Sequence, residues 1–94
     1  MRMIERASAF KRDYRRVKAT PDHSKDIDTL MFNVLATLLA DESLPEYYRD
    51  HALTGNRSRY RECHIKPDLL LIYSKPDSET VRLARLGSHS ELFG

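Results

Sequence analysis

Cysteine is almost absent from the sequence, because Cys63 is the only one, and this excludes an intrachain disulfide and any Cys-x-x-Cys metal site. Glycine is also scarce, with three residues, and there is no glycine-rich loop of the kind that holds phosphate groups. The longest nearly apolar stretch, residues 30–40, is too short to span a bilayer. The first residues lack the apolar stretch of a secretory signal. From these absences we expect a protein of the reducing cytoplasm without a membrane segment.

The charge of the chain is unevenly distributed, although its 94 residues carry a net charge of only +2. Residues 1–25 contain eight Lys or Arg against three Asp or Glu, whereas residues 26–50 contain one against six. Residues 51–94 are basic again, with seven against five. Basic surface at both ends suits an anionic partner such as RNA, but a solvated helix face explains the same charges.

The first half of the sequence predicts a short strand followed by two helices. The strand is expected over residues 2–6. Apolar side chains at helical spacing predict a basic helix over residues 8–19, with Ser8 as its N-cap, and a more apolar helix over residues 24–40. These two helices are expected to form an αα-hairpin.

The second half predicts an extended connection, a loop and then three strands with a short tail. The strands are expected at residues 57–65, 69–74 and 80–86, and the tail at residues 88–94. The whole chain, residues 1–94, is long enough for one domain. The order of elements predicts an α+β fold, in which the N-terminal strand and the two-helix hairpin pack on one face of a small antiparallel sheet.

Polar side chains suited to acid–base chemistry gather at the ends of the predicted strands. They are His51, His64, Asp68, Arg85 and His89. Cleavage of an RNA phosphodiester without a metal needs a base for the 2′-hydroxyl, an acid for the leaving oxygen and a cation for the phosphate. Histidine titrates near neutral pH, and arginine offers a permanent forked charge. The set therefore suits a ribonuclease site, provided that the strands bring its members together.

Each of these residues also has a purely structural interpretation. His51 can bond to its own loop backbone, and Asp68 is a common turn residue after proline. Arg85 can pair with Glu62 across the sheet, and Phe93 can close the core at the C-terminus.

Strand alternation raises a separate question about Arg85. A regular strand places this arginine on the same face as Val81 and Leu83, which turns its charge toward the core. A β-bulge or the end of the strand resolves the conflict, and the sequence leaves both possibilities open.

Three ordered segments carry a resemblance to a known family. Residues 50–55, 60–73 and 82–94 contain the patterns DHxLxG, YRxxHxxPDxxLIY and RxGxHxxLFG, and these resemble the YafQ branch of the RelE/ParE toxin superfamily. The first half of the chain resembles that family only in its helical layout. The resemblance implies a RelE/ParE-like fold and the toxin of a type II toxin–antitoxin pair. It further implies a ribosome-dependent endonuclease that cuts mRNA at A-rich codons, without metal or other cofactor, leaving a 2′,3′-cyclic phosphate and a 5′-hydroxyl.

The resemblance also implies roles for individual residues. His51, His64, Asp68 and His89 match catalytic positions of the family, and Arg85 matches its phosphate-stabilising arginine. His89 is the expected general acid. The base is expected to be His64 or Asp68, assisted by His51.

Substrate contacts and partners follow from the same resemblance. Phe93 matches an aromatic residue beside the substrate, and Arg61 and Lys66 are expected to bind RNA as well. Leu69 departs from the pattern, because this branch often has tryptophan there. The implied partners are a cognate antitoxin in a heterotetramer, the A site of the 70S ribosome with its mRNA, and operator DNA through the antitoxin complex.

Three other functions remain open from the sequence alone. A ParE-like inhibitor of DNA gyrase has the same fold, needs no acid–base set and damages DNA without degrading mRNA. A metal protein could use the same histidines, and a chelator would then abolish its activity. An interaction module that only binds its antitoxin would have neither activity.

Overall fold

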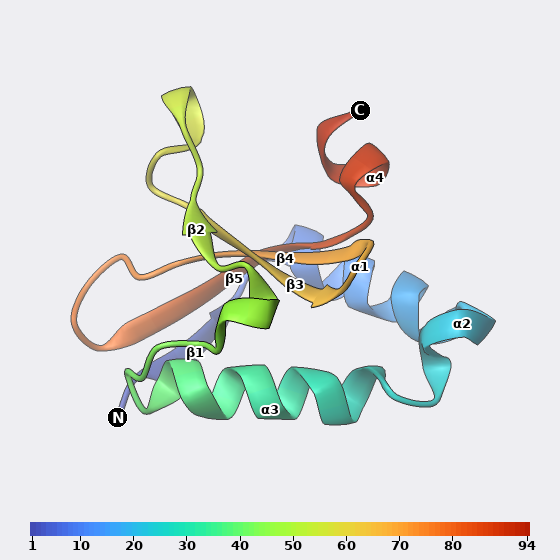
Figure 1. Ribbon diagram of the computed structural model, residues 1–94, viewed down its shortest axis with the longest axis horizontal. Helices are drawn as coiled ribbons and strands as arrows, with labels where there is room; N and C mark the ends of the chain where they lie inside the picture. Colours follow the sequence, from blue (N-terminus) through green and yellow to red (C-terminus); the bar gives the residue numbers. More distant parts are fainter.

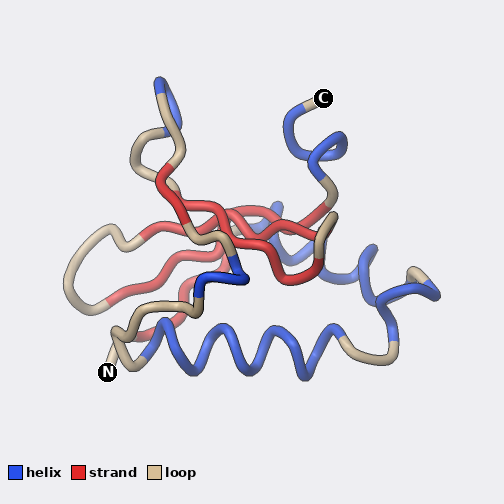
Figure 2. The backbone as a smooth tube through the Cα atoms, viewed as in Figure 1, coloured by secondary structure: helices blue, strands red, loops and turns tan.

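The most apolar segment of the chain forms the central strand of a five-stranded sheet. In the computed structural model, which describes residues 1–94, the strand order is β1-β5-β4-β3-β2 (Figures 1 and 2). The strands are β1 (Met3–Arg6), β2 (His51–Ala52), β3 (Arg61–Lys66), β4 (Leu69–Ser74) and β5 (Thr80–Gly87). Every residue of β4 is buried, as its unbroken apolar run and its place in the middle of the sheet lead one to expect.

Four α-helices accompany the sheet, and none of them is long and apolar enough to cross a membrane. They are α1 (Ser8–Ala19), α2 (Pro21–Ser24), α3 (Ile27–Leu39) and α4 (His89–Phe93). Two short 3₁₀ turns, Glu46–Tyr48 and Gly55–Arg57, lie in the connection between α3 and β3. The predicted strand over residues 2–6 and the helix over residues 8–19 are confirmed.

Several predicted boundaries are wrong, each for a local reason. Ala7 rather than Ser8 is the N-cap of α1. The second helix is shorter than expected, because α3 runs from Ile27 to Leu39, and the connection before it contains the extra turn α2, which begins at Pro21. The first strand of the meander begins at Arg61, after a 3₁₀ turn, and the expected tail is the helix α4.

The α+β fold is confirmed, but the sheet is mixed rather than antiparallel. Strand β1 pairs with β5 in parallel, with Met3 opposite Thr80 and Arg6 opposite Leu83. The other three pairings are antiparallel. Because helices and three strands separate β1 from β5 along the chain, no short-range pattern indicates the direction in which they pair.

The hydrophobic core lies between one face of the sheet and helices α1 and α3. These helices meet through Asp28, which accepts hydrogen bonds from Tyr14 and Lys18 of α1. The core side chains include Phe10, Val17, Ile27, Met31, Val34, Leu38, Cys63, Leu69, Leu71, Tyr73, Val81, Leu83 and Leu86. Burial raises the pKa of the Cys63 thiol to about 12, so this residue is a buried apolar group rather than a nucleophile.

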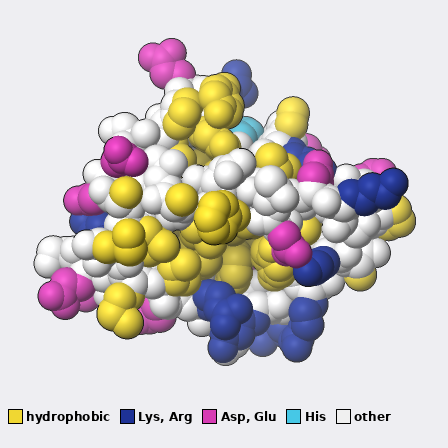
Figure 3. Space-filling view, turned by 90° about the horizontal axis from the view of Figure 1, so that it is seen from below, with side chains coloured by type: hydrophobic (Ala, Val, Ile, Leu, Met, Phe, Trp, Pro, Cys, Tyr) yellow, Lys and Arg dark blue, Asp and Glu magenta, His cyan; other side chains and the backbone are white.

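Some apolar surface stays uncovered on the helical side of the molecule. Phe32 of α3 is 71% exposed, and with Ile4 of β1 it borders an apolar groove of about 560 Å³. Figure 3 shows hydrophobic side chains gathered on this side, with Lys and Arg along one margin.

A β-bulge decides where Arg85 points. Ile72 lies opposite Arg85, whereas the next residue, Tyr73, lies opposite Leu83, so Ala84 is the extra residue on β5. The bulge lets Leu83 and Leu86 both face the helices while Arg85 pairs with Ile72 on the other face. Of the two possibilities left open by the sequence, the bulge is therefore the correct one.

The helix-facing side of β4 should dominate the stability of the fold. Leu71 is fully buried in the core, so Leu71→Ala is expected to lower the free energy of unfolding by about 2–5 kcal/mol. Phe32→Ala removes a larger but exposed side chain and should change it far less. Urea denaturation of both variants checks the prediction, and an equal loss from the two would contradict this view of the core.

Candidate active site

The face of the sheet away from α1 and α3 carries most of the predicted catalytic residues. Register places His51 opposite Glu62, Glu62 opposite Ile72, and Ile72 opposite Arg85. Neighbouring strands are about 4.8 Å apart, so this row of residues extends over about 15 Å. A second row begins at His64 and continues through Leu70 to Gly87. The meander thus brings residues from four strands onto one surface, which we call the open face.

Two histidines of the open face share one carboxylate. Oε1 of Glu62 lies 3.4 Å from Nε2 of His64 and 3.9 Å from Nε2 of His51. Nδ1 of His64 lies 3.2 Å from the carbonyl oxygen of Pro67, and Nδ1 of His51 lies 2.6 Å from that of Arg49. Because a carbonyl oxygen only accepts, each Nδ1 carries the proton in these bonds. In the neutral ring each Nε2 is then free to accept a proton beside a negative charge.

Glu62 is a site residue that the sequence interpretation missed. It was weighed only as a partner of Arg85, and that pairing is wrong, because Arg85 binds Asp13 instead. The available signal was strand alternation: Glu62 and His64 are two residues apart and therefore share a face. The Glu62 carboxylate is buried, whereas the His51 side chain is 53% exposed.

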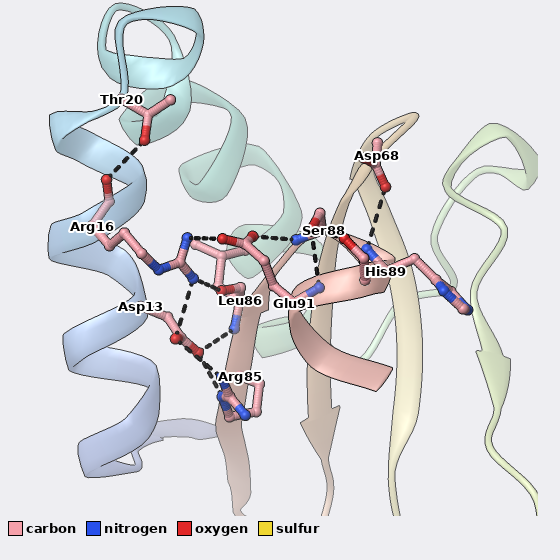
Figure 4. Close-up of polar contacts among 10 residues, drawn as sticks. Asp13, Arg16, Thr20, Asp68, Arg85, Leu86, Ser88, His89 and Glu91 are labelled. Atoms are coloured by element: carbon pink, nitrogen blue, oxygen red, sulfur yellow. Dashed lines mark hydrogen bonds and ion pairs between the residues drawn. The ribbon is translucent and has the colours of Figure 1, made fainter. Parts of the chain in front are cut away.

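Asp13 of α1 fixes Arg85 at the edge of the sheet. Nε of Arg85 donates to Oδ2 of Asp13 over 2.7 Å, and the backbone N–H of Leu86 donates to the same oxygen over 3.0 Å. Arg16 donates to Oδ1. Burial by itself raises the pKa of Asp13, but the hydrogen bonds from Arg85, Leu86 and Arg16 outweigh it, and the pKa is lowered. Figure 4 shows these side chains converging between α1 and β5.

Arg16 links the same edge to the C-terminal helix. One of its nitrogens, Nη2, donates to the carbonyl oxygen of Leu86 over 3.0 Å, and Nη1 donates to Oε2 of Glu91 over 2.9 Å. The strand β1 ends at Arg6, so beyond that point β5 has no neighbouring strand on this side. In place of a strand, helix α1 binds the Leu86 backbone: Asp13 accepts from its N–H, and Arg16 donates to its carbonyl oxygen.

A capping box shapes α4 and places His89. The backbone N–H of Glu91 donates to Oγ of Ser88, and the Glu91 side chain accepts from the Ser88 N–H over 2.8 Å. The backbone N–H of His89 donates to Oδ1 of Asp68 over 3.3 Å. A Cβ added at Gly87 would lie 3.1 Å from Oε1 of Glu91 and 3.2 Å from Nη2 of Arg16, so these side chains would have to shift to admit a larger residue. Asp68 and His89 are therefore brought together, with the His89 side chain extending away from the Arg16 network (Figure 4).

A cleft of about 350 Å³ opens above the sheet, between α4 and the loop that follows β2. These two segments project from the same side of the sheet in Figure 1. The residues that line the cleft include Leu53, Arg57, Tyr60, Ile72, Ala84, Arg85, Leu92 and Phe93. The Phe93 ring also lies beside the His89 ring, with 5.1 Å between centroids.

Two residues expected to bind RNA form ion pairs with acidic side chains. Arg61 faces the helical side, where it and Tyr73 donate to the carboxylate of Asp50. Lys66 donates to the carbonyl oxygen of Asp22 over 2.9 Å and forms an ion pair with Asp26. Arg61 is therefore directed away from the histidines, whereas Lys66 still borders a hollow of about 570 Å³ together with His64.

Leu69, the expected departure from the motif pattern, is buried in the core. The difference at this position is therefore one of packing beneath the sheet. No group of three or more His, Cys, Asp or Glu side chains is arranged to hold a metal ion.

Comparison with solved structures defines the class of protein. A copper-bound variant of a toxin from Helicobacter pylori matches with a TM-score of 0.86 at 37% identity, covering 99% of this chain and 100% of that one. The Escherichia coli DinJ–YafQ toxin–antitoxin complex contains a chain that matches with a TM-score of 0.83 at 31% identity, covering 99% and 98%. The fold is thus that of small bacterial toxins.

Sequence comparison narrows this class to one family. The family model for the bacterial toxin of type II toxin–antitoxin system, YafQ, matches residues 2–94. The mRNA interferase toxin YafQ of Escherichia coli K12 is 38% identical over 95 residues, which cover 98% of this chain and all of that protein. The chain belongs to the YafQ family of type II toxins, as the three sequence motifs predicted.

The Asp13 network predicts an acid-sensitive component of stability. Because the pKa of Asp13 is lowered in the folded state, its contribution is present above the ordinary carboxyl value of 3.8 and is lost as pH falls through the folded value. Asp13→Asn should lower the free energy of unfolding by about 1–3 kcal/mol at pH 7 and flatten its decrease below about pH 5.

Urea denaturation from pH 7 down to pH 3 measures both effects. Glu42→Gln, at an exposed acid that forms no ion pair, is the matched control and should leave the curve unchanged. A pH dependence in Asp13→Asn as steep as that of the wild type would show that this network contributes nothing to the acid response.

Proposed function

We propose that this toxin is an endoribonuclease that cuts translated mRNA in the ribosomal A site by metal-free acid–base catalysis. The observation that carries the proposal is the convergence on the open face, where Glu62 lies between two imidazoles and Asp68 holds the backbone of His89. The activity named for the Escherichia coli relative, mRNA interferase, agrees with this chemistry.

The reaction divides between a base and an acid. Nε2 of His64 takes the proton of the 2′-hydroxyl, and Glu62 supplies a negative charge beside the imidazolium that forms. The 2′-oxygen then bonds to phosphorus as the bond to the 5′-oxygen breaks. His89 gives its proton to that leaving oxygen. The products are a 2′,3′-cyclic phosphate and a 5′-hydroxyl, and His51 assists from the other side of Glu62.

Arg85 stabilises the charge that develops on the phosphate. Its Nε and Nη2 atoms are committed to Asp13, which leaves the N–H groups of Nη1 free. The side chain remains 41% exposed, so these groups are accessible to an anion. Asp13 orients the guanidinium before substrate arrives, and this lowers the cost of ordering it during the reaction.

The partners of this toxin follow from the family and from its relatives. The Escherichia coli YafQ chain was crystallised with the antitoxin DinJ. We propose that a cognate antitoxin neutralises this chain in a heterotetramer, and that operator DNA binds through that complex. The A site of the 70S ribosome presents the mRNA.

Mapping of mRNA 5′ ends after brief expression tests the proposal, with the wild type beside His89→Ala. We expect in-frame cuts at A-rich codons of translated messages in the wild type, and loss of cutting and of growth arrest in His89→Ala. The His89 side chain is exposed, so its removal should change the free energy of unfolding by less than about 0.5 kcal/mol.

Other outcomes of this experiment would indicate a different function or mechanism. Growth arrest with intact messages and damaged DNA would indicate a gyrase inhibitor. Cleavage that stops in excess chelator would indicate a metal in the reaction. Unchanged toxicity of His89→Ala would remove this histidine from the mechanism.

A further inference from the structure

The cleft beside α4 has the volume and the apolar lining of a site for a small ligand. Its volume of about 350 Å³ lies at the lower end of the range for small-molecule pockets. Apolar side chains line most of it, from the loop after β2, from strands β4 and β5, and from α4. The only charged residues in the lining are Arg57 and Arg85, so the cleft is apolar with a purely cationic component.

Arg57 and Phe93 meet at this cleft from distant parts of the chain. The guanidinium carbon of Arg57 lies 4.8 Å from the centroid of the Phe93 ring. Arg57 ends the 3₁₀ turn Gly55–Arg57, and Phe93 ends α4, so the contact joins the two segments that project above the sheet (Figure 1). Arg57 is exposed and forms no ion pair with an acidic side chain, in contrast to Arg85.

These two groups have the chemistry that recognises an unpaired base. Nucleobases stack on aromatic rings and on guanidinium planes, and the stacked base brings a phosphate that an unpaired arginine neutralises. The Phe93 ring also lies next to that of His89, so a base stacked here is adjacent to the proposed general acid. A membrane or an acidic peptide would not need two planar faces.

We propose that Arg57 covers the outer face of one unpaired nucleobase of the RNA substrate in this cleft, while Phe93, already expected beside the substrate, stacks against the other face. Arg57 is then a substrate-binding residue that none of the three sequence motifs contains. The proposal rests on the ribonuclease function above and names the subsite next to the reacting phosphate. To admit the base, the exposed Arg57 side chain moves off the ring.

Binding of short RNA probes tests the subsite directly. The probes are the four homopolymeric oligonucleotides with 2′-O-methyl sugars, which bind but are not cleaved, and the readout is the dissociation constant by fluorescence anisotropy. Arg57→Ala should weaken the best-bound probe about tenfold. Arg57→Lys keeps the charge but loses the planar face, so its dissociation constant should lie between those of the wild type and Arg57→Ala.

Arg59→Ala is the matched control. Arg59 lies two residues away in the same loop and is exposed, but it borders a different hollow, with Lys75 and Arg82. Its replacement removes the same charge and should leave binding unchanged. Phe93→Leu should also weaken binding, and the double variant Arg57→Ala/Phe93→Leu should lose less than the product of the two single effects.

The outcomes separate this inference from the proposed function. Wild-type affinity in Arg57→Ala, or an equal loss in Arg59→Ala, overturns the subsite even if messages are cut. If no probe binds the wild type, the mapped cut sites in mRNA take the place of the binding measurement. The same cut sites in Arg57→Ala as in the wild type would then overturn the subsite. Uncut messages together with Arg57-dependent binding would overturn the ribonuclease function and retain the subsite.

Discussion

The hydrogen bonds and ion pairs of the Asp13 carboxylate connect helix α1 to the edge of the sheet that carries the proposed active site. Asp13 is 6% exposed, and it accepts from Arg85, Arg16 and the backbone of Leu86. A buried charge is tolerated only when such partners compensate its lost hydration. The same contacts also satisfy the backbone of β5 beyond the point where the parallel strand β1 has ended. One side chain of α1 thus joins the helical layer to the open face.

Further contacts from the same edge of the sheet fix the position of the C-terminal helix α4. Arg16 connects the Leu86 carbonyl to Glu91, and Glu91 caps the first turn of α4. Gly87 lets the chain approach these side chains closely. Asp68 then receives the backbone N–H of His89. The proposed acid is therefore positioned by main-chain and ionic contacts, which leaves its imidazole free for chemistry.

Local patterns predicted helices α1 and α3 from their helical periodicity, although with different ends for α3, and strand β4 from its unbroken apolar run. They also brought most of the candidate site together, because alternation and the antiparallel meander place His64, Asp68 and His89 at one end of the sheet. What could not be read locally is the direction of β1 and the pairing of Asp13 with Arg85, which are 72 residues apart. Arg61 and Lys66 look like RNA contacts by charge alone, but acidic partners elsewhere in the fold engage them.

Leu69 is a single position at which the sequence pattern alone is misleading about the place of a residue in the fold. A difference from the family pattern next to a proposed catalytic aspartate suggests an altered active site. The alternation of β4, however, turns this side chain into the core, so neighbours in sequence belong to opposite sides of the sheet. The motif is continuous along the chain, whereas its side chains are divided between the proposed site on the open face and the core on the other face.

The lone cysteine has a practical consequence. Cys63 is fully buried beneath the open face, and its thiol stays protonated at physiological pH. An alkylating reagent therefore meets this sulfur only in molecules whose core has opened. The rate of alkylation of Cys63 therefore measures how often the core opens, without any engineered label. The same measurement applies to the free chain and to the chain bound by a partner.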